Sequence, residues 1–341
     1  MIDFCTFSLP DADSTRLAGR SLIHSLYTFP VTIAVEGELG AGKTTFLQGF
    51  AQAFGVRGAL TSPTYALEQH YRTPRGTLAH LDLYRLSAPD AKWLVLESDH
   101  AASIRCIEWP QRLGPQWHEL IEPNMHIQLR DDGGPGRRLR CVFHDLPLPT
   151  DGEIETWRRE AALAPHIAAH CDAVAAFADR CAQLLIETRA MIVRREALHC
   201  AARVHDLFRS IDFRDGASPE GFRATEEERE RWRSLKERYS GVHHEAACEK
   251  FLRERGYEQL GTIVAAHGLT LPPSDEATIE QKLLFYADKR VAVDRIVSLE
   301  ERFADFARRY GNTSLTVAVK DWFERTKAVE RELFPEGIPK E

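Results

Sequence analysis

Hydrophobic and polar positions follow two different patterns along the chain. Up to about residue 150, short apolar runs rich in β-branched residues alternate with amphipathic stretches of helical period. Strands are predicted over 31–36, 77–83, 103–108, 125–129 and 139–143, and helices over 44–54 and about 90–99. Because strands that alternate with helices build α/β domains, this part predicts an α/β fold with a largely parallel sheet.

The pattern changes at a proline-rich segment, and almost every later stretch has helical period. Helices are predicted over 154–187, 192–211, 225–239, 244–254, 259–267, 276–297 and 315–333. The segment 146–152 is the predicted linker because its prolines end a strand, and Thr150 or Asp151 is placed to cap the next helix. We therefore expect an α/β domain over 1–148 and an all-helical domain over 149–341.

Composition limits the classes of protein that fit. The 341 residues, of which 43% are hydrophobic and 28% charged, suffice for about two soluble domains. No apolar run approaches the roughly 20 residues of a membrane-spanning helix, and we expect no signal peptide at the N-terminus. Seven scattered cysteines without a C-x-x-C motif indicate reduced thiols in a cytoplasmic protein. The net charge of −7 argues against nucleic-acid binding by the chain as a whole.

The sharpest local motif is Gly37-Glu-Leu-Gly-Ala-Gly-Lys-Thr-Thr, which fits the pattern G-x-x-x-x-G-K-[ST]. It stands between a predicted strand and a predicted helix. There, backbone N–H groups and the positive end of the helix bind phosphate. Lys43 is placed to reach the β- and γ-phosphates, and the Thr44 hydroxyl is placed to bind Mg²⁺. The motif therefore predicts a P-loop site for a nucleoside triphosphate.

Two acids stand where a nucleotide hydrolase needs them. Asp82 ends one predicted strand and Glu108 ends another, and open α/β sheets bind ligands at the carboxyl ends of their strands. Either carboxylate can hold hydrated Mg²⁺ or orient a water molecule. A small-molecule kinase is a weaker alternative, because the first domain shows no separate lid or substrate-binding insertion.

Four stretches resemble the TsaE family of bacterial ATPases in their order and spacing: 37–45, 61–65 (TSPTY), 80–86 (HLDLYRL) and 107–110 (IEWP). The resemblance covers roughly residues 6–145. It implies an ATPase that works with the proteins of the threonylcarbamoyl-transferase complex, which makes threonylcarbamoyladenosine in tRNA. ATP hydrolysis would support turnover of that assembly, and the chain would meet tRNA only indirectly and no membrane.

The resemblance also implies roles for single residues. Asp82 and Thr44 would bind Mg²⁺, Glu108 would act as a catalytic or water-positioning acid, and the catalytic set would be Glu108, Lys43 and Asp82. Residues expected to hold ATP are Gly37, Gly40, Ala41, Gly42, Lys43, Thr44, Thr45, Thr61 and Trp109. Thr61 would sense the γ-phosphate from a switch-like loop, whereas simple packing is the alternative for Trp109. A nucleotide-dependent switch that binds a partner with negligible turnover is the alternative function.

The helical domain contains the dipeptide His205-Asp206. A neutral imidazole and a carboxylate are ligands that suit Zn²⁺, Fe²⁺ or Mn²⁺. His170 precedes the pair on a predicted helix, and Asp288 follows it on another. This order, with every member on a helix, resembles the HD superfamily of phosphohydrolases over roughly residues 160–300. The resemblance implies hydrolysis of a nucleotide or another phosphate ester with one or two metal ions.

The implied metal ligands of the helical domain are His170, His205, Asp206, His244, His267 and Asp288. Of these, His244 and His267 are similar to histidines that bind a second metal or contact a phosphate. His166 and His243 are rivals of His170 and His244, and we prefer the second of each pair for its register with the following helix. Gly268 departs from the double histidine of some members. The alternative is a non-catalytic scaffold of the same fold.

Overall fold

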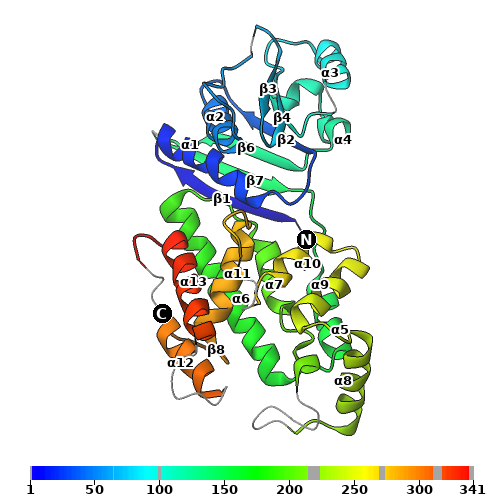
Figure 1. Ribbon diagram of the computed structural model, residues 1–341. Coiled ribbons are helices and arrows are strands. Elements are labelled where there is room, and N and C mark those ends of the chain that lie inside the picture. Colours follow the sequence, from blue (N-terminus) through cyan, green and yellow to red (C-terminus); the bar gives the residue numbers. More distant parts are fainter. Residues whose placement is uncertain are drawn as a thin grey trace. The chain divides into compact units, whose positions relative to one another are not determined.

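A computed structural model describes residues 2–63, 65–98, 101–134, 136–213, 223–268, 273–309 and 317–337. The chain forms two compact units. The α/β unit consists of Ile2–Asp145 together with Leu184–Arg194, and the helical unit consists of Leu146–Gln183 and Arg195–Glu341. Figure 1 shows the strands of the first unit and the helices of the second. The boundary predicted at residue 148 stays a prediction, but the contacts of the first unit include a later segment.

A seven-stranded sheet forms the centre of the α/β unit, in the order β1-β7-β6-β2-β5-β4-β3. The strands are β1 (Asp3–Leu9), β2 (Val31–Gly37), β3 (Glu68–Thr73), β4 (Gly76–Asp82), β5 (Ile104–Glu108), β6 (Met125–Asp131) and β7 (Arg137–Phe143). The pairs β6–β2, β2–β5 and β5–β4 are parallel, whereas β1, β7 and β3 join antiparallel. The sheet is therefore mixed rather than largely parallel.

Two edge strands were absent from the sequence prediction. β3 reads EQHYRT, and its residues are half-buried or exposed, so it lacks the apolar run that marks a strand. β1 alternates buried and exposed residues along its length and lies at the other edge of the sheet. An edge strand needs only one covered face, which weakens its hydrophobic signal.

Within the described part of this unit, four α-helices accompany the sheet: α1 (Ala12–Ser21), α2 (Lys43–Phe54), α3 (Ala88–Glu97) and α4 (Trp117–Ile121). Two short 3₁₀ helices, η1 (Leu22–Ser25) and η2 (Pro110–Leu113), complete the connections. Helices α3 and α4 pack on one core cluster, in which Val95 and Trp117 meet Ala34, Leu81 and Ile107 from three central strands. This packing fixes the strand ends that carry the predicted acids.

The segment Leu184–Arg194 belongs to the α/β unit through a buried ion pair. Nη1 and Nη2 of Arg194 donate to the Asp145 carboxylate, at 2.8 and 2.9 Å, and Nε donates to Ser25 O at 2.9 Å. The side chain of Arg194 is fully buried and that of Asp145 is 3% exposed. A buried charge without its partner is strongly destabilising, so the first unit depends on a residue far along the chain.

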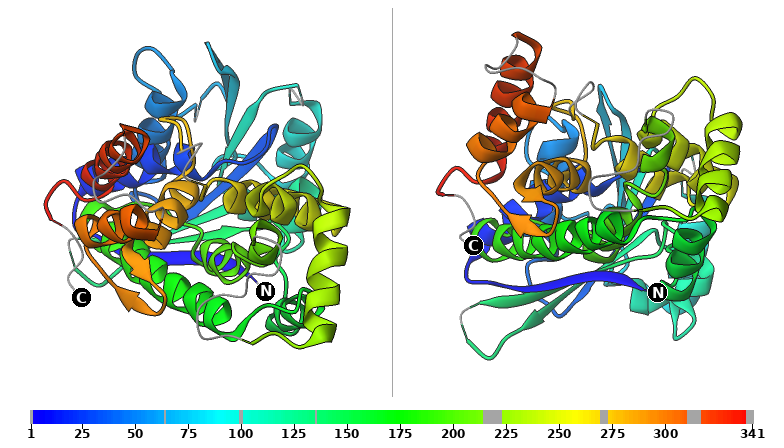
Figure 2. Two further views of the ribbon diagram at one scale, coloured as in Figure 1. Left: turned by 60° about the horizontal axis from the view of Figure 1, so that its bottom comes forward. Right: turned by 90° about the horizontal axis from the view of Figure 1, so that it is seen from below.

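The helical unit contains nine helices among its described residues: α5 (Asp151–Glu160), α6 (Pro165–Arg189), α7 (Arg195–Val204), α8 (Glu226–Arg238), α9 (His244–Glu254), α10 (Glu258–Ala265), α11 (Ile279–Arg290), α12 (Leu299–Arg309) and α13 (Val317–Leu333). The last turns of α6 extend into the segment assigned to the α/β unit. A 3₁₀ helix, η3 (Arg209–Asp212), follows α7. Figure 2 shows α6 as a long helix with its neighbours from two more sides.

Three details of the helical unit differ from the prediction. The stretch 154–187 is two helices because Pro165 begins a new one and Ala162 adopts φ +49 before it. The stretch 276–297 ends its helix at Arg290 and forms a hairpin, β8 (Val291–Ala292) with β9 (Arg295–Ile296), as its β-branched residues favour. Helix α12 was not predicted. The unit is therefore largely helical rather than all-helical.

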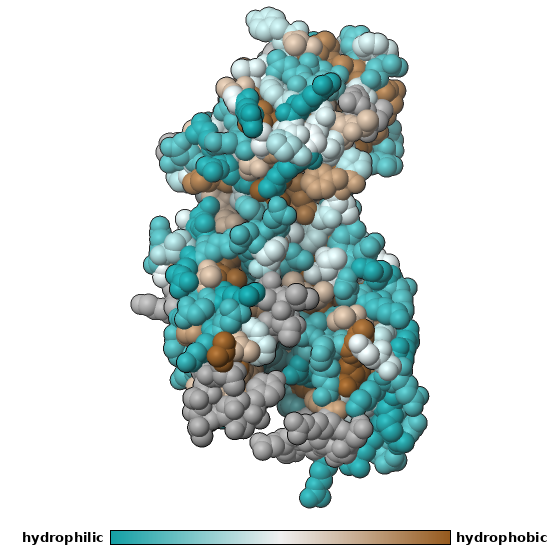
Figure 3. Space-filling model, in the orientation of Figure 1, coloured by the Kyte–Doolittle hydropathy of each residue, from teal (hydrophilic) through white to brown (hydrophobic). Residues whose placement is uncertain are grey.

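The visible surface is mainly hydrophilic, with hydrophobic residues scattered over it (Figure 3). The large exposed hydrophobic side chains include Leu39, Tyr65 and Trp93 of the α/β unit. Within the described ranges, no helix has both the length and the apolar character that crossing a membrane requires.

Candidate functional site

The P-loop motif connects β2 to α2. Gly42 precedes α2 with φ +97, a left-handed conformation that favours glycine. A Cβ added to Gly37 would lie 2.5 Å from Leu129 O, so a side chain at this position would collide with the neighbouring strand. The sequence thus folds locally into a tight turn that leads directly into the N-terminus of a helix, as the motif predicts.

Lys43 lies on the first turn of α2 and is 5% exposed. Its Nζ donates to Gly37 O at 2.9 Å and to Glu38 O at 2.8 Å. The same Nζ lies 3.8 Å from the ring centroid of Trp109, which is a cation–π contact. Burial lowers the pKa of Lys43 below its usual value, and the charges of Glu108 and Asp82 oppose that change. The lysine and the tryptophan predicted at the nucleotide site are therefore in contact.

The two predicted acids lie opposite each other at the ends of neighbouring parallel strands. Asp82 of β4 is the register partner of Glu108 of β5, and both are buried. Glu108 Oε1 accepts a hydrogen bond from Thr44 Oγ1 at 3.1 Å. The lysine, the threonine and both acids are thus gathered at the carboxyl ends of the parallel strands, where α/β proteins bind ligands.

Three residues outside the predicted site set hold these groups in place. His80 Nε2 lies 2.9 Å from Glu108 Oε1, and both side chains are buried. Ser62 Oγ donates to Asp82 Oδ2 at 2.8 Å. Tyr84 packs against the Trp109 ring, with 4.8 Å between the centroids. The strand pattern carried a signal for His80, since residues two apart on a strand share a face and His80 precedes Asp82 by two.

The remaining predicted nucleotide contacts have different surroundings. Ala41 is buried within the loop and Thr45 is half-buried on α2. Thr61 is exposed, and its Oγ1 lies 3.4 Å from Gln69 Oε1, so its role as a γ-phosphate sensor stays a prediction. Thr64 of the same predicted loop lies outside the described residues.

Comparison with known proteins assigns the first unit. A family model described as "Threonylcarbamoyl adenosine biosynthesis protein TsaE" matches residues 9–139. A protein of this name from Synechocystis sp. is 38% identical over 112 residues, which are 31% of this chain and 71% of the relative. One from Nostoc sp. is 38% identical over 146 residues, 40% of this chain and 88% of the relative. The chain belongs to the TsaE family.

One further relative and one solved structure also match the first unit. The TsaE protein of Aquifex aeolicus is 40% identical over 107 residues, 31% of this chain and 75% of the relative. The crystal structure of YdiB from Bacillus subtilis covers 42% of this chain and 87% of its own, with 24% identity and a TM-score of 0.33. The family match ends before the helical unit begins.

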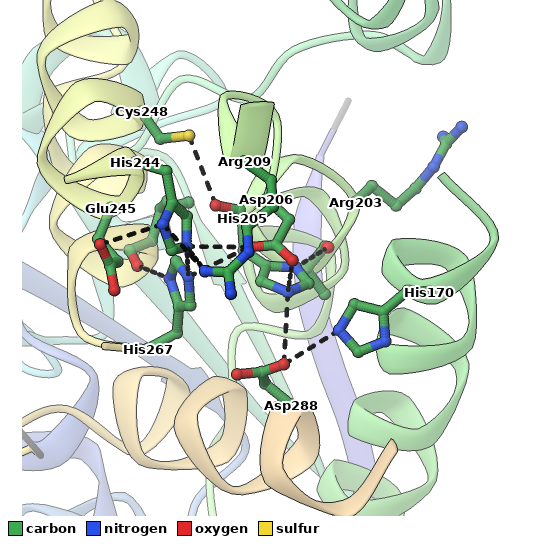
Figure 4. Close-up of polar contacts among 12 residues, drawn as sticks. His170, Arg203, His205, Asp206, Arg209, His244, Glu245, Cys248, His267 and Asp288 are labelled. Atoms are coloured by element: carbon green, nitrogen blue, oxygen red, sulfur yellow. Dashed lines mark hydrogen bonds and ion pairs between the residues drawn. The ribbon is translucent and has the colours of Figure 1, made fainter. Parts of the chain in front are cut away.

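A second cluster of functional groups lies within the helical unit (Figure 4). His205 and Asp206 follow Val204, the last residue of α7, so they stand in a turn and not on a helix as predicted. His267 likewise follows the end of α10. The turn changes the geometry, because adjacent residues on an α-helix point about 100° apart. Here His205 faces Asp288, whereas Asp206 faces His244 and His267.

Two carboxylates form the centre of this cluster. Asp288 Oδ1 lies 3.0 Å from His170 Nε2 and 3.6 Å from His205 Nε2. Asp206 Oδ1 lies 2.9 Å from His244 Nε2 and 3.7 Å from His267 Nε2. All six predicted ligands therefore lie together, although His170 of α6 and Asp288 of α11 are far apart in sequence.

Each of the four histidines is held through its other ring nitrogen. Nδ1 faces a backbone carbonyl in three of them: Val293 O at 3.0 Å for His170, Ala202 O at 2.7 Å for His205 and Val264 O at 2.5 Å for His267. Nδ1 of His244 faces the carboxylate of Asp212 at 2.5 Å. Carbonyl and carboxylate oxygens accept, so each Nδ1 donates. Every Nε2 therefore points at the centre of the cluster.

The electrostatics keep the carboxylates ionised and one imidazole neutral. Burial raises the pKa of Asp206, but His205 and the hydrogen bonds of His244 and His267 hold it well below its usual value. The pKa of Asp288 is also well below its usual value, because Lys289 and the histidines outweigh burial. Burial lowers the pKa of His267 to about 4. Its Nε2 consequently carries a lone pair at neutral pH.

A cavity of about 760 Å³ opens on the cluster. Arg209 and Lys289 line it, with Arg209 Nη1 3.2 Å from His244 Nδ1 and Lys289 Nζ 2.8 Å from His267 O. His243 is 84% exposed and contacts Asp212, so His244 is the buried member of that pair. Asp212 and Arg209 were not predicted as site residues. They lie on η3, and only the fold brings η3 beside α9.

Proposed function

We propose that the chain is an ATPase that supports formation of threonylcarbamoyladenosine in tRNA, the modification that the names of its relatives mention. The gathering of Lys43, Thr44, Asp82 and Glu108 at the P-loop carries the proposal. Thr44 and Asp82 supply the oxygen ligands that Mg²⁺ prefers, so these residues fit the ion. When bound, Mg²⁺ would neutralise phosphate charge.

The surrounding residues would each have a defined task. The backbone before α2 and the Lys43 ammonium would bind the phosphates. Glu108 would orient the attacking water, since Thr44 and His80 both hold its Oε1 and fix the carboxylate. Trp109 would keep the lysine in place through the contact between its ring and Nζ.

The proposed biological role predicts that each transferase complex modifies many tRNA molecules when this chain and ATP are present. The transferase proteins of the same organism, given tRNA and the activated threonylcarbamoyl donor, should modify roughly one tRNA per complex alone. With this chain and ATP they should perform many turnovers. Product per complex, measured by mass spectrometry of tRNA nucleosides, tests this. An equal yield without the chain would reject the role in turnover.

We further propose that the helical unit is a metal-dependent phosphohydrolase of the HD type. The four Nε2 atoms that converge on two ionised carboxylates carry this proposal. His244 Nε2 and His267 Nε2 lie only 3.1 Å apart, so two bare lone pairs would repel unless a proton or a metal cation lay between them. Nε2 of His205 is buried and has no hydrogen-bond partner within the described residues.

The donor set fits a transition metal. Imidazole with carboxylate suits Zn²⁺, Fe²⁺ or Mn²⁺, and two groups of three residues share Asp206: His170 with His205, and His244 with His267. A bound metal would lower the pKa of its water and polarise a phosphoryl oxygen. Arg209 and Lys289 would bind the phosphate of the substrate at this end of the cavity.

Asp212 is a positioning residue for this site, since it holds His244 through Nδ1. Asp212→Asn should weaken metal binding by about 10- to 100-fold, because an outer carboxylate fixes the ring and raises its basicity. Competition with a chelator of known affinity measures the change. Asp179→Asn is the matched control, because Asp179 pairs with Arg195. Equal metal affinity in the two variants would remove Asp212 from the site.

A further inference from the structure

The cavity of the helical unit extends beyond the metal cluster to a wall of flat side chains. Arg302 and Phe306 of α12 and Trp322 of α13 line it. The guanidinium of Arg302 lies over the Phe306 ring, with 4.5 Å between Cζ and the ring centroid. Arg302 is 9% exposed, whereas Phe306 and Trp322 are half-buried. All three residues lie beyond the stretch that resembles the HD superfamily.

The size of the cavity excludes a phosphate ion as its complete ligand. A volume of about 760 Å³ lies within the range that holds organic ligands. One end offers Arg209 and Lys289 beside the carboxylates and histidines, which suits a phosphoryl group. The wall formed by α12 and α13 offers two aromatic rings and a guanidinium plane, all of which stack on flat groups.

We propose that Arg302, Phe306 and Trp322 form a subsite for an aromatic ring, so that the cavity selects phosphate monoesters whose alcohol part carries a flat ring. The proposal rests on the hydrolase function proposed above in one respect, namely that the end of the cavity beside Arg209 and Lys289 binds the phosphate. Stacking on an aromatic side chain tolerates different bases and substituents. The subsite therefore recognises a nucleobase or a similar planar group and rejects an aliphatic alcohol such as glycerol.

Binding without metal tests this subsite independently of catalysis. The Lys43→Ala background removes the P-loop as a competing phosphate site, and a chelator removes the metal. Adenosine 5′-monophosphate should bind about tenfold more tightly than glycerol 3-phosphate by calorimetry, the amount expected for one stacked base. Trp322→Ala should remove this difference, and Trp322→Phe should retain most of it because the ring remains. Trp93→Leu is the control, since Trp93 is 65% exposed on α3.

The outcomes separate the subsite from the hydrolase. Equal affinity for the two esters, or an equal loss for both in Trp322→Ala, overturns the subsite. Ring-selective binding that persists in a protein without metal-dependent hydrolysis supports the subsite and rejects the hydrolase. Metal-dependent hydrolysis of both esters at equal kcat/KM supports the hydrolase and overturns the subsite. Circular dichroism of each variant shows whether the fold survives the substitution.

Discussion

Lys43→Ala is expected to lower the rate of ATP hydrolysis by at least about 100-fold. A loss of this size follows when an enzyme loses one preorganised group that stabilises the negative charge developing in the transition state. The Nζ of Lys43 is already held at the loop by Gly37 O, Glu38 O and the Trp109 ring, so little reorganisation accompanies phosphate binding. Steady-state phosphate release with saturating Mg²⁺ and ATP measures kcat. Lys43→Met keeps the buried stem but not the charge, and it should lose as much.

Asp206→Ala is the matched control for the P-loop, because it alters the other unit and should leave ATP turnover unchanged. Full turnover in Lys43→Ala would show that the P-loop assignment is wrong. Tight ATP binding with negligible turnover in the unaltered chain, together with nucleotide-dependent partner binding by Glu108→Ala, would instead favour a nucleotide switch. ATP affinity by calorimetry separates these cases.

Asp206→Ala is expected to abolish metal binding by the helical unit. Asp206 belongs to two of the three groups of candidate ligands, the one with His170 and His205 and the one with His244 and His267, so its loss breaks these two together. The affinity should fall by more than the roughly 10- to 100-fold expected for an outer carboxylate. Elemental analysis after loading with Mn²⁺, Fe²⁺ or Zn²⁺ and gel filtration measures bound metal per chain.

Two further variants make this result specific. Asp206→Asn preserves the volume and tests whether the charge or the packing matters, while Asp172→Ala removes an exposed carboxylate of α6 that pairs with the buried Arg158. Asp172→Ala should retain its metal. An unaltered chain that holds no metal after loading, and hydrolyses no phosphate ester, would support a non-catalytic scaffold.

The sequence predicted those parts of the molecule that depend on local pattern. The P-loop was identifiable because its residues are consecutive and its strand and helix flank it. The acids Asp82 and Glu108 were identifiable because each ends an apolar run. The six residues of the helical cluster were named through a resemblance to the HD superfamily, and the structure places them together; their metal binding stays a prediction.

Other features depend on contacts between distant segments and leave no local pattern. His80 is not among the predicted site residues, yet it touches Glu108 from the neighbouring strand. Asp212 reaches His244 only because η3 packs beside α9. The turn that holds His205 and Asp206 also escaped prediction, since helical periodicity continues past Val204, whereas His205 Nδ1 bonds back to Ala202 O.

The ion pair between Asp145 and Arg194 bears on how the gene for such a chain could arise or be divided. The coding sequence of the α/β unit is not one continuous block, since the partner of Asp145 is encoded after the start of the helical unit. A gene shortened after codon 145 would encode a product with an uncompensated buried carboxylate. Neither unit can therefore be moved into another protein as one continuous segment of the gene. Such a transfer requires redesign of the pair formed by Asp145 and Arg194.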